Sequence, residues 1–571
     1  MPQIMALNTD HRAESLARMA DETFDVLVVG GGVVGAGAAV DAVTRGLSVA
    51  LVEQRDYASG TSSRSSKLIH GGLRYLEQYN FGLVREALAE RALLLRKLCP
   101  HLVHPVPFLF PFTRRAIDRA YIGAGVALYD LLGLLSGARA VPYHRHLSKR
   151  RALQIAPALR EDSLVGAIQY YDAQVDDARH TMMLARTAAM YGAALATSVR
   201  VTDLVQDNQR VVGAQLHDLD ADRHLTVRAK HVINATGVWT DDVNKMLGGQ
   251  TKLEVRPSKG IHIVVPRERI RLDSGMITKT EKSVLFVIPW NGHWIIGTTD
   301  TDYQLGRAHP PSSAQDIQYV LDHVNEWIVD PLTVDDIEGV YAGLRPLIAE
   351  SPDQTTASLS REHSIMQPVE GLTIIAGGKY TTYRVMAKDA VDAAAAKMDE
   401  PVPPSVTREV ATIGAEGYQA LRNSRRGLAQ RSGLHLAVID HLLGRYGSLI
   451  TDLLDLIAER PELGEPIAGA DAYIKAEAVY AARAEGALHL EDVLVRRTRI
   501  SFEASDGGIQ AANDIVGLVG DELGWDEERR TRELDSYRDR VEAERAAHAE
   551  ATEEAAEQAR LRAPDIRAGA A

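Results

Sequence analysis

The first structural unit is visible in the alternation of apolar and small residues near the amino end of the chain. Residues 24–29 (FDVLVV) are apolar, residues 30–46 open with glycines and continue in a helical pattern, and residues 47–52 (LSVALV) are again mostly apolar. This order is typical of a strand, a tight turn, a helix and a second strand. We therefore predict a β-α-β unit here.

Similar apolar runs recur along the chain between helical stretches. They lie at residues 199–205, 231–235, 261–265, 284–288, 294–296 and 372–375. No internal repeat of solenoid period accompanies them. The pattern favours an α/β fold.

The pattern changes after residue 398. Residues 398–405 (MDEPVPPS) concentrate proline without periodicity, which favours a boundary, and we expect a linker over 399–411. Residues 412–540 have helical spacing with little strand signal, which predicts an appended helical domain. Residues 541–571 are rich in Ala, Glu and Arg, and we expect a charged tail that is a frayed helix or disordered.

Charge and cysteine content exclude several classes of function. The chain has 64 basic and 77 acidic residues, which give a net charge of −13. The overall charge of the protein therefore does not attract nucleic acid, and any anion-binding site must be formed by a local group of basic residues. The single cysteine, Cys99, excludes an internal disulfide and is expected to be buried. No His/Glu spacing predicts a metal site. Residues 1–20 lack a signal-peptide core, so we expect a cytoplasmic protein.

The glycine turn carries the first candidate chemistry. Gly30, Gly32 and Gly35 fit G-x-G-x-x-G, and Glu53 closes the following strand. Gly30 permits the tight turn, Gly32 lets the backbone approach a pyrophosphate, and Gly35 allows the helix to pack closely on the strand. Glu53 would accept hydrogen bonds from a ribose. Because strand, turn, helix, strand and acid occur in order, we predict dinucleotide binding rather than a packing turn.

Two later strand ends could lie beside the same cofactor. One strand ends in Ala235, Thr236 and Gly237, and another runs through Gly378 into a helix that starts near Lys379. The positive end of that helix would stabilise the negative charge of a reduced flavin. No second G-x-G-x-x-G is present, which argues against a separate nicotinamide site.

Longer motifs resemble those of FAD-dependent, quinone-linked sn-glycerol-3-phosphate dehydrogenases. The resemblance begins with residues 59–77 (SGTSSRSSKLIHGGLRYLE) and continues through residues 170–179, 234–239, 286–290, 296–300, 341–347, 377–384 and 491–497. It covers roughly residues 22–540.

The resemblance implies a discontinuous Rossmann-like FAD-binding domain, an antiparallel β-rich substrate domain and a C-terminal α-helical domain. After an N-terminal extension (1–22), the oxidoreductase region would span 23–398. Its FAD-binding segments would be about 23–100, 165–250 and 335–398, and its substrate or cap segments about 100–165 and 250–335.

The resemblance also implies site residues. Further cofactor-binding residues would be Gln54, Thr61, Ser65, Ser66, Lys67, Leu68, Tyr380 and Thr381. The substrate would meet His70, Arg74, Tyr75, Lys259, Arg345 and Lys379. A glycerol phosphate dianion needs several cations, and arginine suits bidentate phosphate contacts.

The implied reaction oxidises the C2 alcohol of sn-glycerol 3-phosphate to dihydroxyacetone phosphate, with hydride transfer to flavin N5. His70 is the leading candidate base because imidazole titrates near working pH, although it could instead only hydrogen-bond the flavin or substrate. Arg345 and Lys379 would anchor the phosphate or polarise the C2 oxygen. Asp176, Asp177 and Arg179 are expected to serve structural ion pairs or helix capping, because neighbouring carboxylates on a strand point to opposite faces.

The resemblance implies a quinone as electron acceptor, a peripheral position at the inner face of the plasma membrane, and a homodimer. Residues 113–151 combine eight Arg and Lys residues with the apolar stretch 120–135, which is too short to span a bilayer. This stretch could lie in an anionic membrane interface or be a buried helix with solvated basic ends. A flavin oxidase that uses oxygen and a non-catalytic, membrane-docked flavoprotein are the alternative functions.

Overall fold

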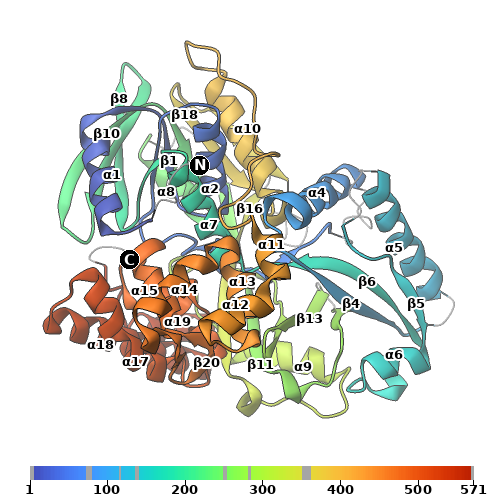
Figure 1. Cartoon of the computed structure of the whole chain (residues 1–571). Helices are drawn as coiled ribbons and strands as arrows, with labels where there is room; N and C mark the ends of the chain where they lie inside the picture. The colour runs from blue at the N-terminus through green and yellow to red at the C-terminus, as the bar shows by residue number, and fades with distance from the viewer. Residues whose placement is uncertain are drawn as a thin grey trace.

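The computed structural model describes residues 6–72, 80–114, 117–135, 140–248, 254–280, 284–349 and 362–567. Two sheets lie side by side, and a group of helices formed by the last third of the chain packs below the first sheet in Figure 1. The α/β fold with a discontinuous Rossmann-like domain and a C-terminal helical domain is confirmed.

The first sheet is built around the predicted β-α-β unit. Its parallel strands are β1 (Thr23–Val29), β2 (Val49–Val52), β7 (Ala194–Ala196), β10 (Arg223–Asn234) and β18 (Leu372–Gly377), in the order β18-β10-β1-β2-β7. Strand β17 (His363–Met366) adds an antiparallel edge, and β8 (Val199–Asp207) and β9 (Arg210–Asp218) extend β10 as an antiparallel pair. Residues Val26–Val29 of β1 are all buried, as expected for a parallel strand covered on both faces.

Helices cover both faces of this sheet. They are α1 (Thr9–Asp21), α2 (Val33–Thr44), α7 (Asp177–Met190), α8 (Thr240–Lys245) and α10 (Tyr383–Ala395). The N-terminal extension is part of this packing: α1 contacts β7, and the amide of Leu7 donates to the carbonyl of Ala484 at 3.0 Å. The amino end thus joins the first sheet to the C-terminal helices.

The second sheet is mostly antiparallel. It contains β3 (Leu68–Ile69), β4 (His104–Phe112), β5 (Arg145–Ser148), β6 (Gly166–Gln174), β11 (Glu254–Pro266), β12 (Gly275–Lys279), β13 (Val284–Trp290), β14 (His293–Gly297), β15 (Thr301–Asp302) and β16 (Gly339–Ala349). Helices α4 (Phe81–Leu93), α5 (Ile117–Leu135), α6 (Lys149–Ile155) and α9 (Ala314–Asn325) pack around it.

Three strands from the segments that were expected to bind FAD belong to the second sheet. They are β3, β6 and β16, from the expected segments 23–100, 165–250 and 335–398. Strands β6 and β16 pair along their whole length with antiparallel partners, β6 with β4 and β16 with β11. An apolar run predicts a strand, but it does not say which sheet offers the backbone partners.

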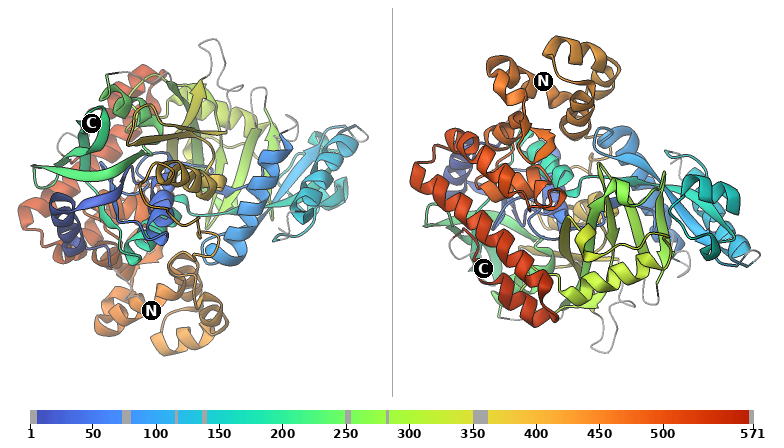
Figure 2. Two further views of the ribbon diagram at one scale, coloured as in Figure 1. Left: turned by 90° about the horizontal axis from the view of Figure 1, so that it is seen from above. Right: turned by 90° about the horizontal axis from the view of Figure 1, so that it is seen from below.

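The C-terminal region is helical, as predicted, with one short hairpin. Its helices are α11 (Tyr418–Asn423), α12 (Arg425–Ser432), α13 (Leu436–Tyr446), α14 (Ile450–Glu459), α15 (Lys475–Ala484), α16 (Ile500–Glu503), α17 (Ile509–Leu523), α18 (Glu527–Ala549) and α19 (Glu553–Arg560). The hairpin pairs β19 (Pro466–Ile467) with β20 (Ala470–Ile474). Figure 2 shows the orange helices projecting from the body, while the red helix α18 runs towards α9.

The expectation of a frayed or disordered tail over 541–571 is wrong for its described part. Helix α18 continues unbroken to Ala549, α19 follows, and Arg567 is buried in ion pairs. Alanines supply much of the buried surface of these helices, and Ala547, Ala556 and Ala559 are each at most 1% exposed. The apolar positions of α18 show little helical periodicity, so the sequence pattern underestimates the packing of that helix.

The helical region and the first sheet share one core. A single apolar cluster includes Val28 of β1, Ala39 of α2 and Met183 of α7 together with Leu442 of α13 and Leu453 of α14. Cys99 lies in the same cluster and is fully buried, as expected.

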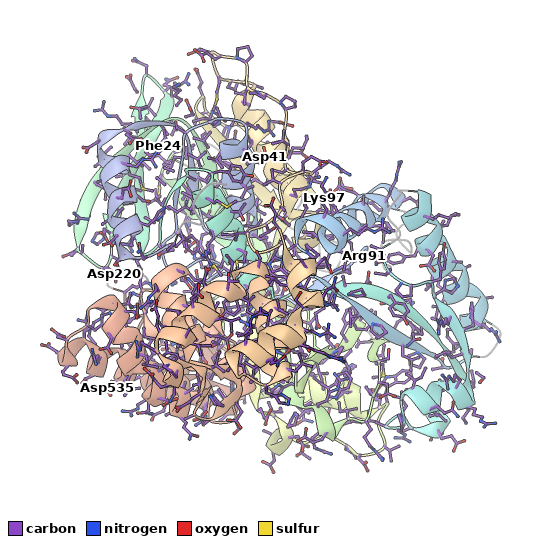
Figure 3. All side chains as sticks on the ribbon, viewed as in Figure 1. Phe24, Asp41, Arg91, Lys97, Asp220 and Asp535 are labelled. Carbon is purple, nitrogen blue, oxygen red and sulfur yellow. The ribbon has the colours of Figure 1, made fainter. Side chains whose placement is uncertain are left out.

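A polar contact crosses the boundary between sheet and helices as well. Asp220, in the turn between β9 and β10, lies between the first sheet and the C-terminal helices (Figure 3), and its Oδ1 is 3.1 Å from Nε2 of His489. The C-terminal helices are therefore packed on the sheet domain rather than tethered to it.

Candidate functional site

Four parallel strands of the first sheet, β1, β2, β10 and β18, end at one cavity of about 920 Å³. Its lining includes Gly30 and Gly32 after β1, Glu53 after β2, Ala235–Gly237 after β10, and Gly378 and Lys379 after β18. Ligands of open α/β sheets bind at the carboxyl ends of the strands. On its other side the cavity reaches β16 of the second sheet through Leu344 and Arg345. The cavity therefore lies between the two sheets.

The glycine turn is shaped by close backbone contacts. Gly30 has φ of +109°, and a Cβ there would lie 2.8 Å from the carbonyl oxygen of Ala235. A Cβ on Gly35 would lie 1.9 Å from the carbonyl oxygen of Gly30, so the helix can approach the strand only with glycine at this position. The roles predicted for Gly30 and Gly35 fit this geometry, and the turn can bring backbone N–H groups up to a pyrophosphate.

Glu53 is oriented by the turn that it faces. Its Oε2 accepts from the amide of Gly31 at 2.7 Å, and its Oε1 accepts from the amide of Arg55 at 2.9 Å. A carboxylate has about four acceptor positions, so these bonds leave capacity for ribose hydroxyls. The position of Glu53 in the cavity fits the role predicted for it.

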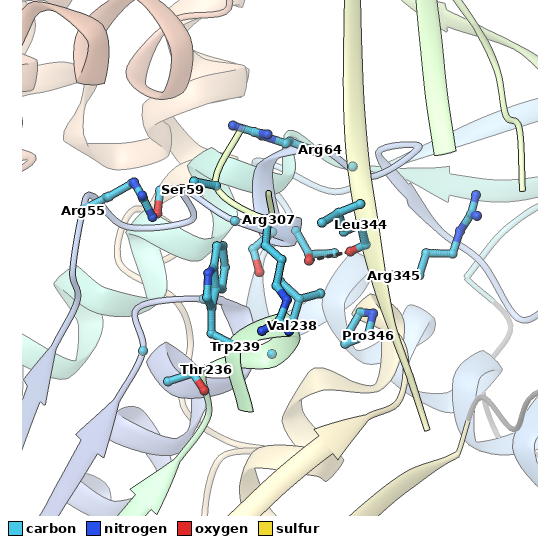
Figure 4. Close-up of a pocket in the computed structure, with 18 of the residues that line it drawn as sticks. Arg55, Ser59, Arg64, Thr236, Val238, Trp239, Arg307, Leu344, Arg345 and Pro346 are labelled. Carbon is cyan, nitrogen blue, oxygen red and sulfur yellow. Dashed lines mark hydrogen bonds between the residues drawn. The ribbon is translucent and has the colours of Figure 1, made fainter. Parts of the chain in front are cut away.

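The cavity carries local positive charge within an acidic protein. Among its described lining residues, six arginines and one lysine face four carboxylates: Arg55, Arg64, Arg200, Arg307, Arg345, Arg560 and Lys379 against Glu53, Asp242, Glu557 and Asp565. Figure 4 shows Arg55, Arg64 and Arg307 around Trp239, with Arg345 extending away from this group beyond β16. The cavity is suited to ligands that carry phosphate groups.

His70 lies on a short segment that is held from two sides. Its amide donates to Oγ1 of Thr381 at 3.1 Å, and its carbonyl accepts from the same hydroxyl at 3.2 Å. The amide of the next residue, Gly71, donates to the phenol oxygen of Tyr129 at 2.7 Å. These bonds fix the backbone that presents His70 to the cavity.

Arg345 is oriented by groups on β11 and on the segment after β14. Its guanidinium lies 3.2 Å from Oδ1 of Asp300, and it also donates to Oγ1 of Thr298 at 3.1 Å and to the carbonyl of Thr299 at 3.2 Å. The side chain is 26% exposed. Arg345 therefore faces the cavity in a constrained orientation while part of its charge is balanced by Asp300.

His262 is a cavity residue that the sequence reasoning missed. Its Nε2 is 2.9 Å from Oγ of Ser66, and its ring stacks on Tyr341 with centroids 4.8 Å apart. Burial, together with the nearby charges of Lys67 and Arg345, holds the pKa of His262 well below its ordinary value. The ring is thus a neutral group at physiological pH. The contact with Ser66 joins residues 196 positions apart, so no local sequence signal marks His262.

The helix expected near Lys379 is present. Lys379 precedes a helical turn, Tyr380–Thr382, that leads directly into α10. Gly377 and Gly378 have φ of +73° and +80°, a conformation that glycine adopts without strain. The amino end of this helix therefore borders the cavity through Lys379 and Tyr380.

Most of the predicted site residues line this cavity. They are Gly30, Gly32, Glu53, Gln54, Thr61, Ser65, Ser66, Leu68, His70, Ala235, Thr236, Gly237, Arg345, Gly378, Lys379 and Tyr380. Gly35 lies behind the turn and Thr381 holds the backbone of His70. Arg74 and Tyr75 lie outside the described residues.

The structure places Lys259 away from the cavity, contrary to its predicted contact with substrate. The side chain is fully buried, with Nζ 2.7 Å from Asp316 and 2.5 Å from Glu553. Successive side chains of β11 point to opposite faces, so Gly260 and His262 reach the cavity and Lys259 does not.

Lys67 also lies outside the cavity lining, although it was expected to contact the flavin. Its Nζ is 2.9 Å from Asp177, and the side chain is fully buried. Burial and the charge of Arg499 lower the pKa of Lys67 to about 8. Its interactions support the loop that carries Ser65 and Ser66 rather than exposing a cation to a ligand.

Asp176 and Asp177 have the structural role that was predicted, at a different type of position. Asp176 caps α7 by accepting from the amide of Arg179 at 3.2 Å, and both carboxylates meet the guanidinium of Arg499. They lie at a helix start and not on a strand, so they do face a common partner. That partner is a cation of the C-terminal region.

Several other cavity residues were not predicted. They include Arg55, Arg64, Trp239, Asp242, Arg307, His309 and residues between Glu557 and Asp565 of the C-terminal end. Arg55, Arg64 and Trp239 fall within or next to the quoted motifs, so proximity to a motif was an available signal. Residues 557–565 carry no such signal.

The chain is similar to known proteins over almost its whole length. The family described as FAD dependent oxidoreductase matches residues 25–384, and the C-terminal domain of alpha-glycerophosphate oxidase matches residues 405–530. A glycerol-3-phosphate dehydrogenase of Mycobacterium leprae is 53% identical over 562 residues, which cover 98% of this chain and 95% of that protein. The mitochondrial glycerol-3-phosphate dehydrogenase of Homo sapiens is 38% identical over 549 residues, covering 92% and 74%.

A solved structure has the same arrangement. The glycerol-3-phosphate dehydrogenase of Bacillus halodurans, complexed with FAD, superposes with a TM-score of 0.77 at 29% identity, covering 94% of this chain and 98% of that one. The L-alpha-glycerophosphate oxidase of Mycoplasma pneumoniae, at 18% identity and a TM-score of 0.52, shares the fold over 68% of this chain.

Proposed function

Because this chain belongs to the family of FAD-dependent glycerol-3-phosphate dehydrogenases, we propose that it oxidises the C2 alcohol of sn-glycerol 3-phosphate to dihydroxyacetone phosphate and passes the electrons to a membrane quinone. One observation carries the proposal. A single cavity joins the glycine turn and Glu53 to His70, Arg345 and Lys379. FAD, when bound, supplies the two-electron acceptor for the hydrogen on C2.

Arg345 and Lys379 are the cations that would meet the substrate. Both line the cavity, and Arg345 is held by Asp300 and Thr298 in an orientation that needs little further ordering. Guanidinium groups suit a phosphate because they offer paired N–H donors. We assign phosphate binding to Arg345 and the polarisation of the C2 oxygen to Lys379.

His70 is the group that would remove the C2 hydroxyl proton. Its backbone is held by Thr381, and its side chain lines the cavity between the two sheets. His262 lines the same cavity but hydrogen-bonds Ser66, and its strongly lowered pKa makes it a poor proton acceptor. The balance of these features favours His70 as the base and His262 as a neutral wall residue.

Anaerobic spectroscopy of the purified holoprotein tests the reaction. Glycerol 3-phosphate should bleach the oxidised flavin spectrum under argon, and a quinone analogue should restore it. A flavin that stays oxidised would contradict the substrate assignment. Rapid recovery in air with no response to quinone would instead favour an oxidase.

The variant His70→Asn separates proton removal from binding. The rate of flavin reduction should fall roughly 10²–10⁴-fold, the range that a general base contributes. Stopped-flow absorbance at saturating substrate measures this rate. The matched control is His435→Asn, which changes an exposed histidine of the C-terminal region that lies outside the cavity lining. An unchanged rate in His70→Asn would assign His70 to hydrogen bonding alone.

Helix α5 supports a peripheral membrane position. Its buried face includes Val126 and Tyr129, whereas its exposed positions Tyr121, Leu131 and Leu134 are 48–59% exposed. From Ala120 onwards the other exposed positions of the helix, Ala120, Ala124 and Ala127, are also apolar. One exposed basic residue, Arg119, lies in the first turn of the helix, and others lie outside its ends at Arg114, Arg145, Arg150 and Arg151.

An exposed apolar face with basic residues at its ends is suited to an anionic lipid surface, where a quinone is dissolved. No helix among the described residues is long and apolar enough to cross a membrane. An oxidase that passes electrons to oxygen would not need this exposed apolar face. The homodimer stays a prediction.

A further inference from the structure

The last described part of the chain forms part of the cofactor cavity. We call residues 550–567, which contain α19, the C-terminal strap. The cavity lining includes Glu557, Arg560, Leu561, Ala563, Pro564 and Asp565 of the strap. The two family matches end at residues 384 and 530, so the strap lies beyond both.

The first half of the strap is attached to the substrate side of the molecule. The carbonyl of Glu550 accepts from the amide of Ala314 at 2.8 Å, and Glu553 pairs with the buried Lys259 at 2.5 Å. Glu557 accepts from the amide of Gly306 at 2.5 Å. These contacts reach α9, β11 and the segment after β15.

The second half is attached to the first sheet beside the residue that would bind ribose. Asp565 accepts from Nε of Arg55 at 2.9 Å, and Arg55 itself donates its amide to Glu53. Arg567 donates to Oγ of Ser198 at 3.0 Å and pairs with Asp492 at 2.6 Å. The side chains of Asp565 and Arg567 are only 3% and 1% exposed. The strap thus spans the cavity from the second sheet to the first.

The strap also turns an apolar side chain towards the cavity. Leu561 lines the cavity but is 62% exposed, in contrast to the buried alanines of α19. An apolar ligand surface that covered Leu561 would be stabilised, because the burial of apolar surface is favourable. The adenosine part of FAD has this chemistry and belongs at the end of the cavity that Glu53 marks.

We propose that the C-terminal strap is a cofactor-binding element that forms the adenosine-side wall of the FAD cavity, and that strap docking and FAD binding stabilise each other. The stabilisation is reciprocal, because any group that binds the docked form more tightly also favours docking. This inference rests on the FAD cofactor of the family and not on the identity of the substrate.

Arg567→Met tests the proposal because Arg567 anchors the strap without lining the cavity. Release of FAD from diluted holoprotein, followed by the rise in flavin fluorescence, should become roughly 10-fold faster. The matched control Arg562→Met removes an exposed arginine of the strap and should release FAD at the rate of the unmodified protein. Equal release rates in Arg567→Met and the control would overturn the proposal.

A second measurement uses the unmodified chain and so does not depend on a variant that folds. Amide hydrogen exchange of residues 553–567 is compared in the FAD-loaded and FAD-depleted protein. We expect exchange of the strap to be slowed by FAD, while exchange of α17 is the internal reference. Exchange of the strap that FAD leaves unchanged would contradict the coupling. A protein that holds FAD but does not oxidise glycerol 3-phosphate would overturn the proposed function and leave this inference intact.

Discussion

Arg345 illustrates how a single side chain is oriented by its neighbours before any ligand binds. Strand β16 places it opposite Ser258 of β11, and Asp300 and Thr298 occupy two sides of its guanidinium. An arginine held in this way loses little rotamer freedom when it binds a phosphate. Asp300 forms an ion pair with Arg345 at 3.2 Å and balances part of its charge. The Arg345 side chain is still partly exposed, so a phosphate can also reach the guanidinium.

Arg345→Met should therefore act on substrate binding. Loss of a charge-assisted phosphate contact is worth about 1.5–3 kcal/mol, or roughly 10- to 100-fold in KM for glycerol 3-phosphate, with a smaller effect on kcat. Steady-state kinetics with a quinone analogue measure both constants. Arg256→Met, which removes the ion-pair partner of Asp302 near the start of β11, is the matched control. A lowered kcat with unchanged KM would reassign Arg345 to the C2 oxygen.

At the scale of elements, α5 differs from the other helices of the substrate domain. Its buried positions recur at Gly123, Val126, Tyr129 and Gly133, as expected for a helix that packs on one side. The opposite side is apolar as well, although nothing described in the chain covers Leu131 or Leu134. The sequence allowed either a buried helix or a helix in a membrane interface. In the structure one face of α5 is buried and the other is suited to a lipid surface.

The double variant Leu131→Glu with Leu134→Glu should abolish binding to anionic vesicles. Two carboxylates would replace the apolar contact and repel anionic headgroups, whereas flavin reduction by glycerol 3-phosphate should be unchanged. Co-sedimentation with phosphatidylglycerol vesicles measures binding. The control Val329→Glu with Val334→Glu alters exposed valines elsewhere, 57% and 59% exposed, and should bind normally. Equal vesicle binding by the two double variants would rule out α5 as the membrane contact.

At the scale of the whole molecule, buried charges connect the sheet domain to the C-terminal helices. His489 lies between Asp220 of the β9–β10 turn and Glu533 of α18, at 3.1 Å and 2.9 Å. Burial and the charge of Arg567 disfavour the imidazolium, but hydrogen bonds to the two carboxylates outweigh them and raise the pKa of His489 to about 9. A protonated histidine thus joins three parts of the chain.

This pKa predicts a pH-dependent contribution to stability. The folded-state pKa lies above the ordinary value of 6.5, so the stabilisation is complete below pH 6.5 and is lost as the pH rises towards 9. The pKa shift of His489 adds at most about 3 kcal/mol to the free energy of unfolding. His489→Gln should be less stable than the unmodified protein at pH 6.5, and the difference in thermal unfolding temperature should shrink by pH 9.5. A difference that does not change with pH would show that His489 is not charged in the folded state. His224→Gln, in the exposed β9–β10 pair, is the control.

Much of the nucleotide-binding half was predictable because its determinants are local. The spacing of Gly30, Gly32, Gly35 and Glu53 follows from the geometry of one turn and the strand after it, and the structure brings all four into the expected arrangement. The buried Cys99 and the helix near Lys379 were likewise accessible from short segments.

The remaining features depend on contacts between distant segments. Alternation along β11 shows that Lys259 and His262 point to opposite faces, but only the packing of β16 and the first sheet decides which face is the cavity. No motif marks residues 550–567, although helix α19 within them is amphipathic. Their role arises from ion pairs with Lys259, Arg55 and Asp492, partners between about 75 and 510 residues away in the chain, whose proximity follows from the tertiary structure alone.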